Sequence, residues 1–134
     1  MPIARKNASI PTEEFPFSLP ASENIPLGAL VSLVRNEQEA VEVVLTNTQN
    51  ADRLLGFAKF AVASGSEGKY LVTRGSRVTP LSDIPLLPNQ PVYAVNDGKV
   101  SNTPPDSGVV VSVGFAVSPT QIVFITDQQI FNGT

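Results

Sequence analysis

Short apolar segments alternate with turn-forming residues along most of the chain. Residues 109–117 are rich in valine, and a Ser-Pro-Thr turn separates them from a second apolar segment at 121–126. β-branched segments bounded by Gly, Pro, Asn and Asp are typical of strands and turns. The pattern predicts an all-β fold, a small β-barrel or sandwich of about eight short, mostly antiparallel strands. Strands are expected near 29–34, 39–45, 53–60, 69–74, 77–79, 91–95, 99–101, 109–117 and 121–126.

Two copies of a Gly-Phe-Ala sequence stand out within the predicted strands. The first copy is Gly56-Phe57-Ala58 and the second is Gly114-Phe115-Ala116. Two copies are too few for a repeat architecture. They are compatible with an ancestral duplication and equally with two corresponding strands of one barrel. Between them, Asn96-Asp97-Gly98 predicts a tight turn, because these residue types accept a positive φ at low cost.

The first 26 residues differ from the remainder in composition. They contain five of the chain's 12 prolines, too closely spaced for a helix or a central strand. We therefore expect an extended Pro-rich N-terminal arm at residues 1–26 and a single β domain at 27–134. The arm also carries large apolar residues, which lets it either fold back on its own domain or lie along a neighbouring protein. The candidate anchors are Ile10, Phe15, Phe17 and Leu19.

A second Pro-rich stretch lies between residues 80 and 91. It contains four prolines and four large aliphatic residues, so it cannot pair as a central strand. We interpret it as an apolar covering loop. Its candidate contacts, with the domain or with another subunit, are Leu81, Ile84, Leu86 and Leu87.

Composition argues against several classes of function. The chain has no histidine and no cysteine, which removes the commonest general base and the commonest metal ligands. We therefore expect no enzyme activity, no metal and no cofactor. The net charge of −3 argues against a nucleic-acid partner, since phosphate binding needs a basic face. No apolar segment is long enough to cross a membrane, so we expect synthesis as a soluble protein and no membrane partner.

One binding function remains open from the residues alone. Tyr70 and Tyr93 lie on predicted strands and could stack on a sugar ring, although strand tyrosines are more often core or barrel-rim residues. This leaves a module that recognises a glycan as an alternative to a protein that binds other proteins.

A series of short sequences resembles a known group of proteins. The series comprises Ile-Pro-Leu-Gly-Ala-Leu-Val (25–31), Leu-Leu-Gly-Phe-Ala (54–58), Gly-x-x-Val (75–78), Leu-Pro-Asn-Gln-Pro-Val-Tyr (87–93), Asp-Gly-Lys-Val-Ser (97–101) and Val-Gly-Phe-Ala (113–116). It is similar to the small β-rich virion proteins of tailed bacteriophages, namely capsid decoration (cement) proteins and related head-fibre or tail modules. The sequence departs from that group at Asn89-Gln90, where such proteins often have a Gly-Asp turn.

The resemblance implies a virion structural protein made in the host cytoplasm and located on the outer surface of the capsid. It implies a homotrimer that binds the major capsid protein non-covalently and stabilises the junctions between capsomers. In this interpretation the β domain makes the trimer contacts and the arm anchors on a neighbouring subunit. The alternative is a phage tail or head-fibre module that recognises a glycan on the host surface.

Overall fold

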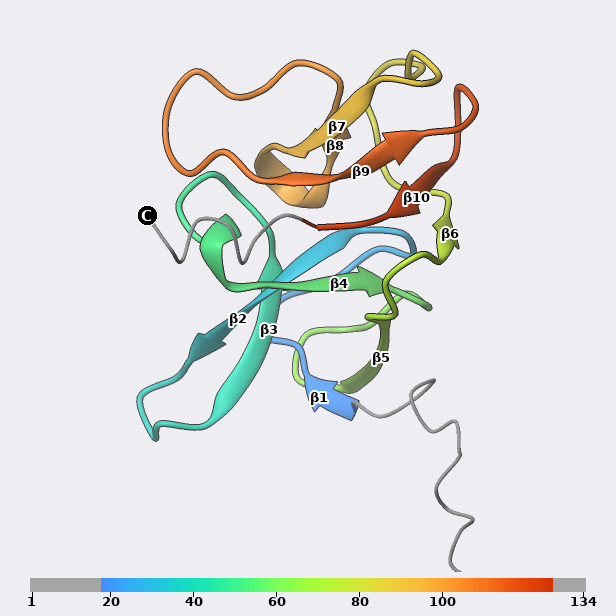
Figure 1. Cartoon of the computed structure of the whole chain (residues 1–134). Coiled ribbons are helices and arrows are strands. Elements are labelled where there is room, and N and C mark those ends of the chain that lie inside the picture. The colour runs from blue at the N-terminus through green and yellow to red at the C-terminus, as the bar shows by residue number, and fades with distance from the viewer. Residues whose placement is uncertain (1–17, 127–134) are drawn as a thin grey trace, which may run out of the picture.

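The chain folds into two antiparallel five-stranded β-sheets that pack face to face (Figure 1). The computed structural model describes residues 18–126. The all-β prediction is confirmed, with ten short strands in the described part rather than about eight. In spatial order, the first sheet contains β1 (Ser18–Pro20), β5 (Glu67–Leu71), β4 (Leu54–Ala58), β2 (Leu30–Arg35) and β3 (Val41–Leu45). The second contains β6 (Arg77–Val78), β10 (Ile122–Phe124), β9 (Ser112–Ala116), β7 (Pro91–Ala94) and β8 (Val100–Ser101).

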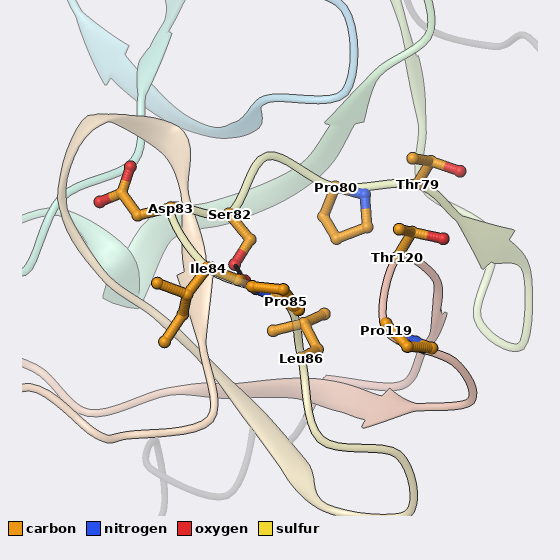
Figure 2. A pocket seen from close by; sticks show the side chains of 9 residues that line it. All are labelled: Thr79, Pro80, Ser82, Asp83, Ile84, Pro85, Leu86, Pro119 and Thr120. Atoms are coloured by element: carbon orange, nitrogen blue, oxygen red, sulfur yellow. Dashed lines mark hydrogen bonds between the residues drawn. The ribbon is translucent and has the colours of Figure 1, made fainter.

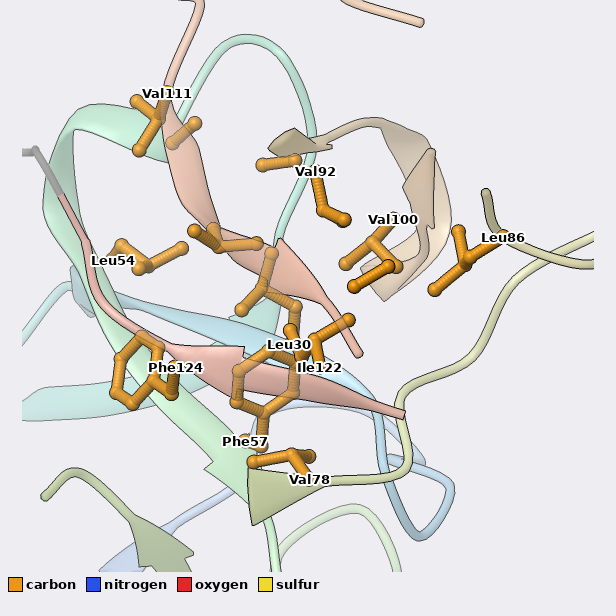
Figure 3. Packing of buried hydrophobic residues seen from close by; sticks show 14 residues of the cluster. Leu30, Leu54, Phe57, Val78, Leu86, Val92, Val100, Val111, Ile122 and Phe124 are labelled. Carbon is orange, nitrogen blue, oxygen red and sulfur yellow. The ribbon is translucent and has the colours of Figure 1, made fainter. Parts of the chain in front are cut away.

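The larger of two hydrophobic cores lies between the sheets (Figure 3). Leu30 and Phe57 reach it from the first sheet, and Val92, Ile122 and Phe124 reach it from the second. The rings of Phe57 and Phe124 meet edge to face, with centroids 5.2 Å apart and planes at 88°. This geometry is favoured by the ring quadrupoles and adds to the stabilisation from burial alone.

The smaller core is enclosed by the first sheet, which curls back on itself. Ala21, just after β1, forms a parallel bridge with Val43 of β3, the strand at the other end of the sheet. The backbone N–H of Ser22 donates to the carbonyl oxygen of Val43 at 3.0 Å and reinforces this closure. Tyr70 is buried in this core, and its hydroxyl donates to the carbonyl oxygen of Leu19 at 3.3 Å. The first sheet is thus an almost closed five-stranded barrel.

The glycines of the two Gly-Phe-Ala copies have the same structural role. A Cβ on Gly56 in β4 would collide with the carbonyl oxygen of Leu71, and a Cβ on Gly114 in β9 would collide with that of Val123. Each glycine therefore allows a neighbouring backbone to approach closely. The two phenylalanines differ: Phe57 is 1% exposed, whereas Phe115 is 49% exposed and points away from the core.

The two sheets are also tied together by the loop that follows β3. The backbone N–H of Thr48 donates to Oδ1 of Asn96 at 3.1 Å, and the carbonyl oxygen of Thr46 accepts from the N–H of Gly98 at 2.9 Å. Asn96 and Gly98 belong to a short 3-10 helix, η4 (Asn96–Gly98), in which both Asp97 and Gly98 have positive φ. The predicted turn is therefore present, and it fixes the second sheet to the first.

The boundary of the predicted arm lies too far along the chain. Residues 18–26 are part of the domain, because β1 pairs with β5 and Ala21 and Ile25 are buried. Leu19 packs against the smaller core, so it is a component of the domain and not an arm anchor. β1 has only three residues and lies among prolines, so the alternation typical of a strand could not be recognised there. Residues 1–17, with Ile10, Phe15 and Phe17, lie outside the described residues, as do 127–134.

The two phenylalanines give a direct test of this packing. Phe57→Ala should lower the free energy of unfolding by about 3–5 kcal/mol, because it leaves a cavity beside Phe124. Phe115→Ala should change it by no more than about 0.5 kcal/mol, because that ring already lies at the surface. Urea unfolding of both variants measures the difference. Equal losses would contradict the assignment of Phe115 to the outer face.

Tyr70 gives a second test, through the pH dependence of stability. Burial, followed by the nearby charge of Glu67, raises the pKa of Tyr70 above its ordinary value. The unfolded chain therefore releases this proton at about pH 10, while the folded chain retains it to higher pH. Stability from this group is complete below the unfolded pKa and is lost as the pH rises through the folded pKa. Urea unfolding from about pH 8 to about pH 11 should show this decline, and Tyr70→Phe should make it shallower.

Candidate interaction surface

The covering loop at residues 80–91 presents apolar side chains to solvent as well as to the core. Leu86 is 3% exposed and belongs to the larger core, and Leu81 packs against the smaller one. Ile84 and Leu87, in contrast, are 66% and 62% exposed. Of the four predicted contact residues, Leu81 and Leu86 therefore cover this chain's own cores, and Ile84 and Leu87 remain available to another molecule.

Backbone hydrogen bonds hold this loop in place along its length. The N–H of Leu86 donates to the carbonyl oxygen of Pro119 at 2.9 Å, and the N–H of Asn89 donates to that of Ala116 at 2.7 Å. On the other side, Oδ1 of Asn102 accepts from the N–H of Leu87 at 2.7 Å. The loop is thus fixed to β9 and to the residue after β8. A fixed loop loses little conformational entropy when it binds.

An ion pair braces the start of the loop. Nζ of Lys99 lies 2.7 Å from Oδ1 of Asp83, and Oγ of Ser82 donates to the carbonyl oxygen of Ile84 at 2.6 Å. The hydrogen bond to Asp83, and then the charge of the same carboxylate, raise the pKa of Lys99. Because the pair is open to solvent, we regard it as a positioning contact and not as a major source of stability.

Two shallow grooves flank the loop, and Ile84 lines both of them. One groove, of about 370 Å³, lies between the loop and the β9–β10 turn (Figure 2). Pro80 and Pro85 form one wall of this groove, and Pro119 and Thr120 lie on the opposite side. The second groove, of about 400 Å³, lies between the loop and residues 103–106. Ile84 is therefore an apolar ridge between two hollows, a shape that suits contact with a complementary protein surface.

The outer face of the second sheet adds further exposed apolar area. Phe115 in β9 pairs with Val123 of β10 on one side and with Pro91 of β7 on the other, and paired residues share a face of the sheet. Val117 is also exposed, at 39%. The sequence did not identify this face, because residues 113–117 are apolar at every position and alternation cannot show which side is buried.

The aromatic residues considered for glycan stacking are poorly placed for it. Tyr70 is 1% exposed, so its ring cannot contact a sugar, and Tyr93 is partly buried. Residues 18–126 contain no group of three or more His, Cys, Asp and Glu side chains that could hold a metal ion. In the same part of the chain there is no helix long and apolar enough to cross a membrane.

Comparisons with known proteins give a structural neighbour but no sequence relative. No family model matches the chain, and no curated protein matches it. Among solved structures, the chain resembles the crystal structure of the head fibre gp8.5 N base of bacteriophage phi29, with a TM-score of 0.60 and 14% sequence identity. The match covers 84% of this chain and 92% of that one. The two chains therefore share a fold over nearly their whole length.

Two adjacent loop residues provide a test of the surface. Leu86→Ala should lower the free energy of unfolding by about 2–5 kcal/mol, because its side chain is buried in the larger core. Leu87→Ala should change it by no more than about 0.5 kcal/mol. Thermal or urea unfolding of the two variants measures this, and a large loss for Leu87→Ala would show that Leu87 packs within the domain.

Proposed function

We propose that this chain is a structural protein of a bacteriophage head, and that it acts by binding and not by catalysis. The observation that carries the proposal is the shared fold with the phi29 head fibre N base, which extends over most of both chains. The resemblance of residues 25–126 to small β-rich virion proteins supports the same role.

In the finer form of this proposal, the chain is a decoration (cement) protein. It binds the major capsid protein on the outer surface of the head as a homotrimer and stabilises the junctions between capsomers. The fixed covering loop supports such a role, since Ile84 and Leu87 present apolar area without a further ordering cost. Burying each of these side chains could supply about 1.5–3 kcal/mol. We assign them to the contacts between copies or with the capsid.

The second candidate function is that of a fibre base, which seats a projecting fibre on the head. The structural neighbour favours it, because that protein is a head fibre N base. A cement protein and a fibre base both bind the head, but they differ in consequence. Loss of a cement protein weakens the shell, whereas loss of a fibre base removes projections and leaves the strength of the shell unchanged.

Cosedimentation with phage heads tests the proposal. Full-length protein should pellet with heads of the encoding phage that lack it, and Ile84→Asp combined with Leu87→Asp should lose most of this binding because two charged groups would have to be desolvated. Val41→Asp, at an exposed apolar position on the first sheet, serves as the matched control and should bind as the parent does. Absence of binding by the parent protein would contradict a head-associated role.

Light scattering distinguishes a loop that contacts another copy of the chain from a loop that contacts the phage head. A homotrimer should give a mass near three times the 14.2 kDa of one chain. If the loop variant becomes a monomer, Ile84 and Leu87 lie between copies; if it stays a trimer and fails to bind, they contact the head. Resistance of heads to heating, with and without the protein, then distinguishes a cement protein from a fibre base.

A further inference from the structure

A third groove lies at the seam between the two sheets, and the start of the covering loop contributes Pro80 and Leu81 to its lining. This seam groove has a volume of about 480 Å³. Its lining is mainly apolar, with Leu27, Phe57, Leu71 and Leu81 among the contributors. Leu27 is 61% exposed and follows Pro26 in a turn whose third residue, Gly28, has a φ of +87°. The groove is therefore an apolar hollow at the surface with part of its wall uncovered.

Three cationic side chains lie in or next to the lining of this groove. Lys59 and Arg77 line it, and Lys69 lies next to Lys59 across the ladder, where the N–H of Lys59 donates to the carbonyl oxygen of Lys69 at 3.0 Å. None of the three has a carboxylate partner within 4.0 Å among residues 18–126, although Glu67 is on the same strand as Lys69. Like charges opposite each other in a sheet repel. In a chain of net charge −3, this gathering of cations favours an acidic occupant.

The chain itself contains a segment with the matching chemistry, and this segment ends at the residue before β1. Ser18, the first residue of β1, pairs with Lys69. The residues before it, 10–17, read Ile-Pro-Thr-Glu-Glu-Phe-Pro-Phe, in which Glu13 and Glu14 are adjacent and large apolar residues flank them. Eight extended residues span about 26 Å, which is ample to reach across the groove. The two prolines reduce the entropy lost when such a segment is fixed.

We propose that residues 10–17 dock into the seam groove of their own chain. Phe15 and Phe17 contact the apolar lining, and Glu13 and Glu14 lie beside the cations of the rim. The segment then forms a strap across the seam between the two sheets. The proposal rests on the groove and its charges and is independent of any role on a phage head.

Paramagnetic relaxation provides the test, and the absence of cysteine makes it simple to set up. A nitroxide is attached to full-length ¹⁵N-labelled Thr12→Cys protein. The amide signals of Leu27, Lys59 and Arg77 should lose most of their intensity relative to the reduced, diamagnetic sample. Glu39, in the distant β2–β3 turn (Figure 1), should keep its intensity. Unchanged signals around the groove would overturn the proposal.

A mixed sample distinguishes the same chain from a second copy. Here the spin label is on unlabelled Thr12→Cys protein and the ¹⁵N label is on the parent chain. Docking within one chain predicts no loss of intensity in this mixture. A loss equal to that of the first sample would instead assign the groove to the segment of a neighbouring copy and overturn docking within one chain.

Charge exchange tests the recognition itself. Glu13→Lys with Glu14→Lys should abolish the loss of intensity, and so should Lys59→Glu with Arg77→Glu. Combining all four substitutions should restore it, whereas Arg35→Glu, at the end of β2 and outside the lining of the groove, should have no effect. Because Lys59 and Arg77 are exposed, these changes leave the cores intact. Persistence of the effect in both charge-reversed pairs would contradict the proposed ionic contacts.

Discussion

The structure depends on strand β2, which has to satisfy two cores at once. Leu30 packs into the larger core between the sheets, and the next residue, Val31, packs into the smaller core inside the first sheet. A strand buried on both faces cannot carry polar side chains without partners. Ser32 is also fully buried, and its hydroxyl is satisfied by that of Thr46 at 2.8 Å. The surrounding strands are placed by this double burial, since β3 and β4 both pair with β2.

The burial of β2 on both faces also explains the position of the covering loop. The second sheet can cover only one face of the first, so its own strands have one buried face and one open face. The chain leaves β6 and reaches β7 through residues 79–90, which run along the edge of the larger core and insert Leu86 into it. Anchoring at Leu86 forces the adjacent residue, Leu87, outward. The exposure of this surface is thus a direct result of how the core is closed.

Much of the fold could be predicted from the sequence, because its signals are local. Turn residues such as Asn96-Asp97-Gly98 and valine-rich segments indicate strands and their ends without knowledge of partners. The order of the strands in each sheet could not be predicted, since it depends on contacts between distant residues. Phe57 and Phe115 share the same Gly-Phe-Ala sequence, yet one lies in the core and the other on the surface. The difference arises from which neighbours β4 and β9 have, and no local pattern contains that information.

The candidate surface, like the fold, could be predicted only in part. The loop and its four aliphatic residues could be found from composition, but which of them face outward is decided by the hydrogen bonds to Pro119, Ala116 and Asn102. The cations of the seam groove could not be recognised in the sequence, where Lys59, Lys69 and Arg77 are scattered. Pairing of β4 with β5 brings Lys59 beside Lys69, and Arg77 in β6 of the second sheet lines the same groove as Lys59. A mildly acidic protein can therefore present a local basic rim. Net charge describes the surface as a whole, whereas the pairing of strands determines where cationic side chains lie close together.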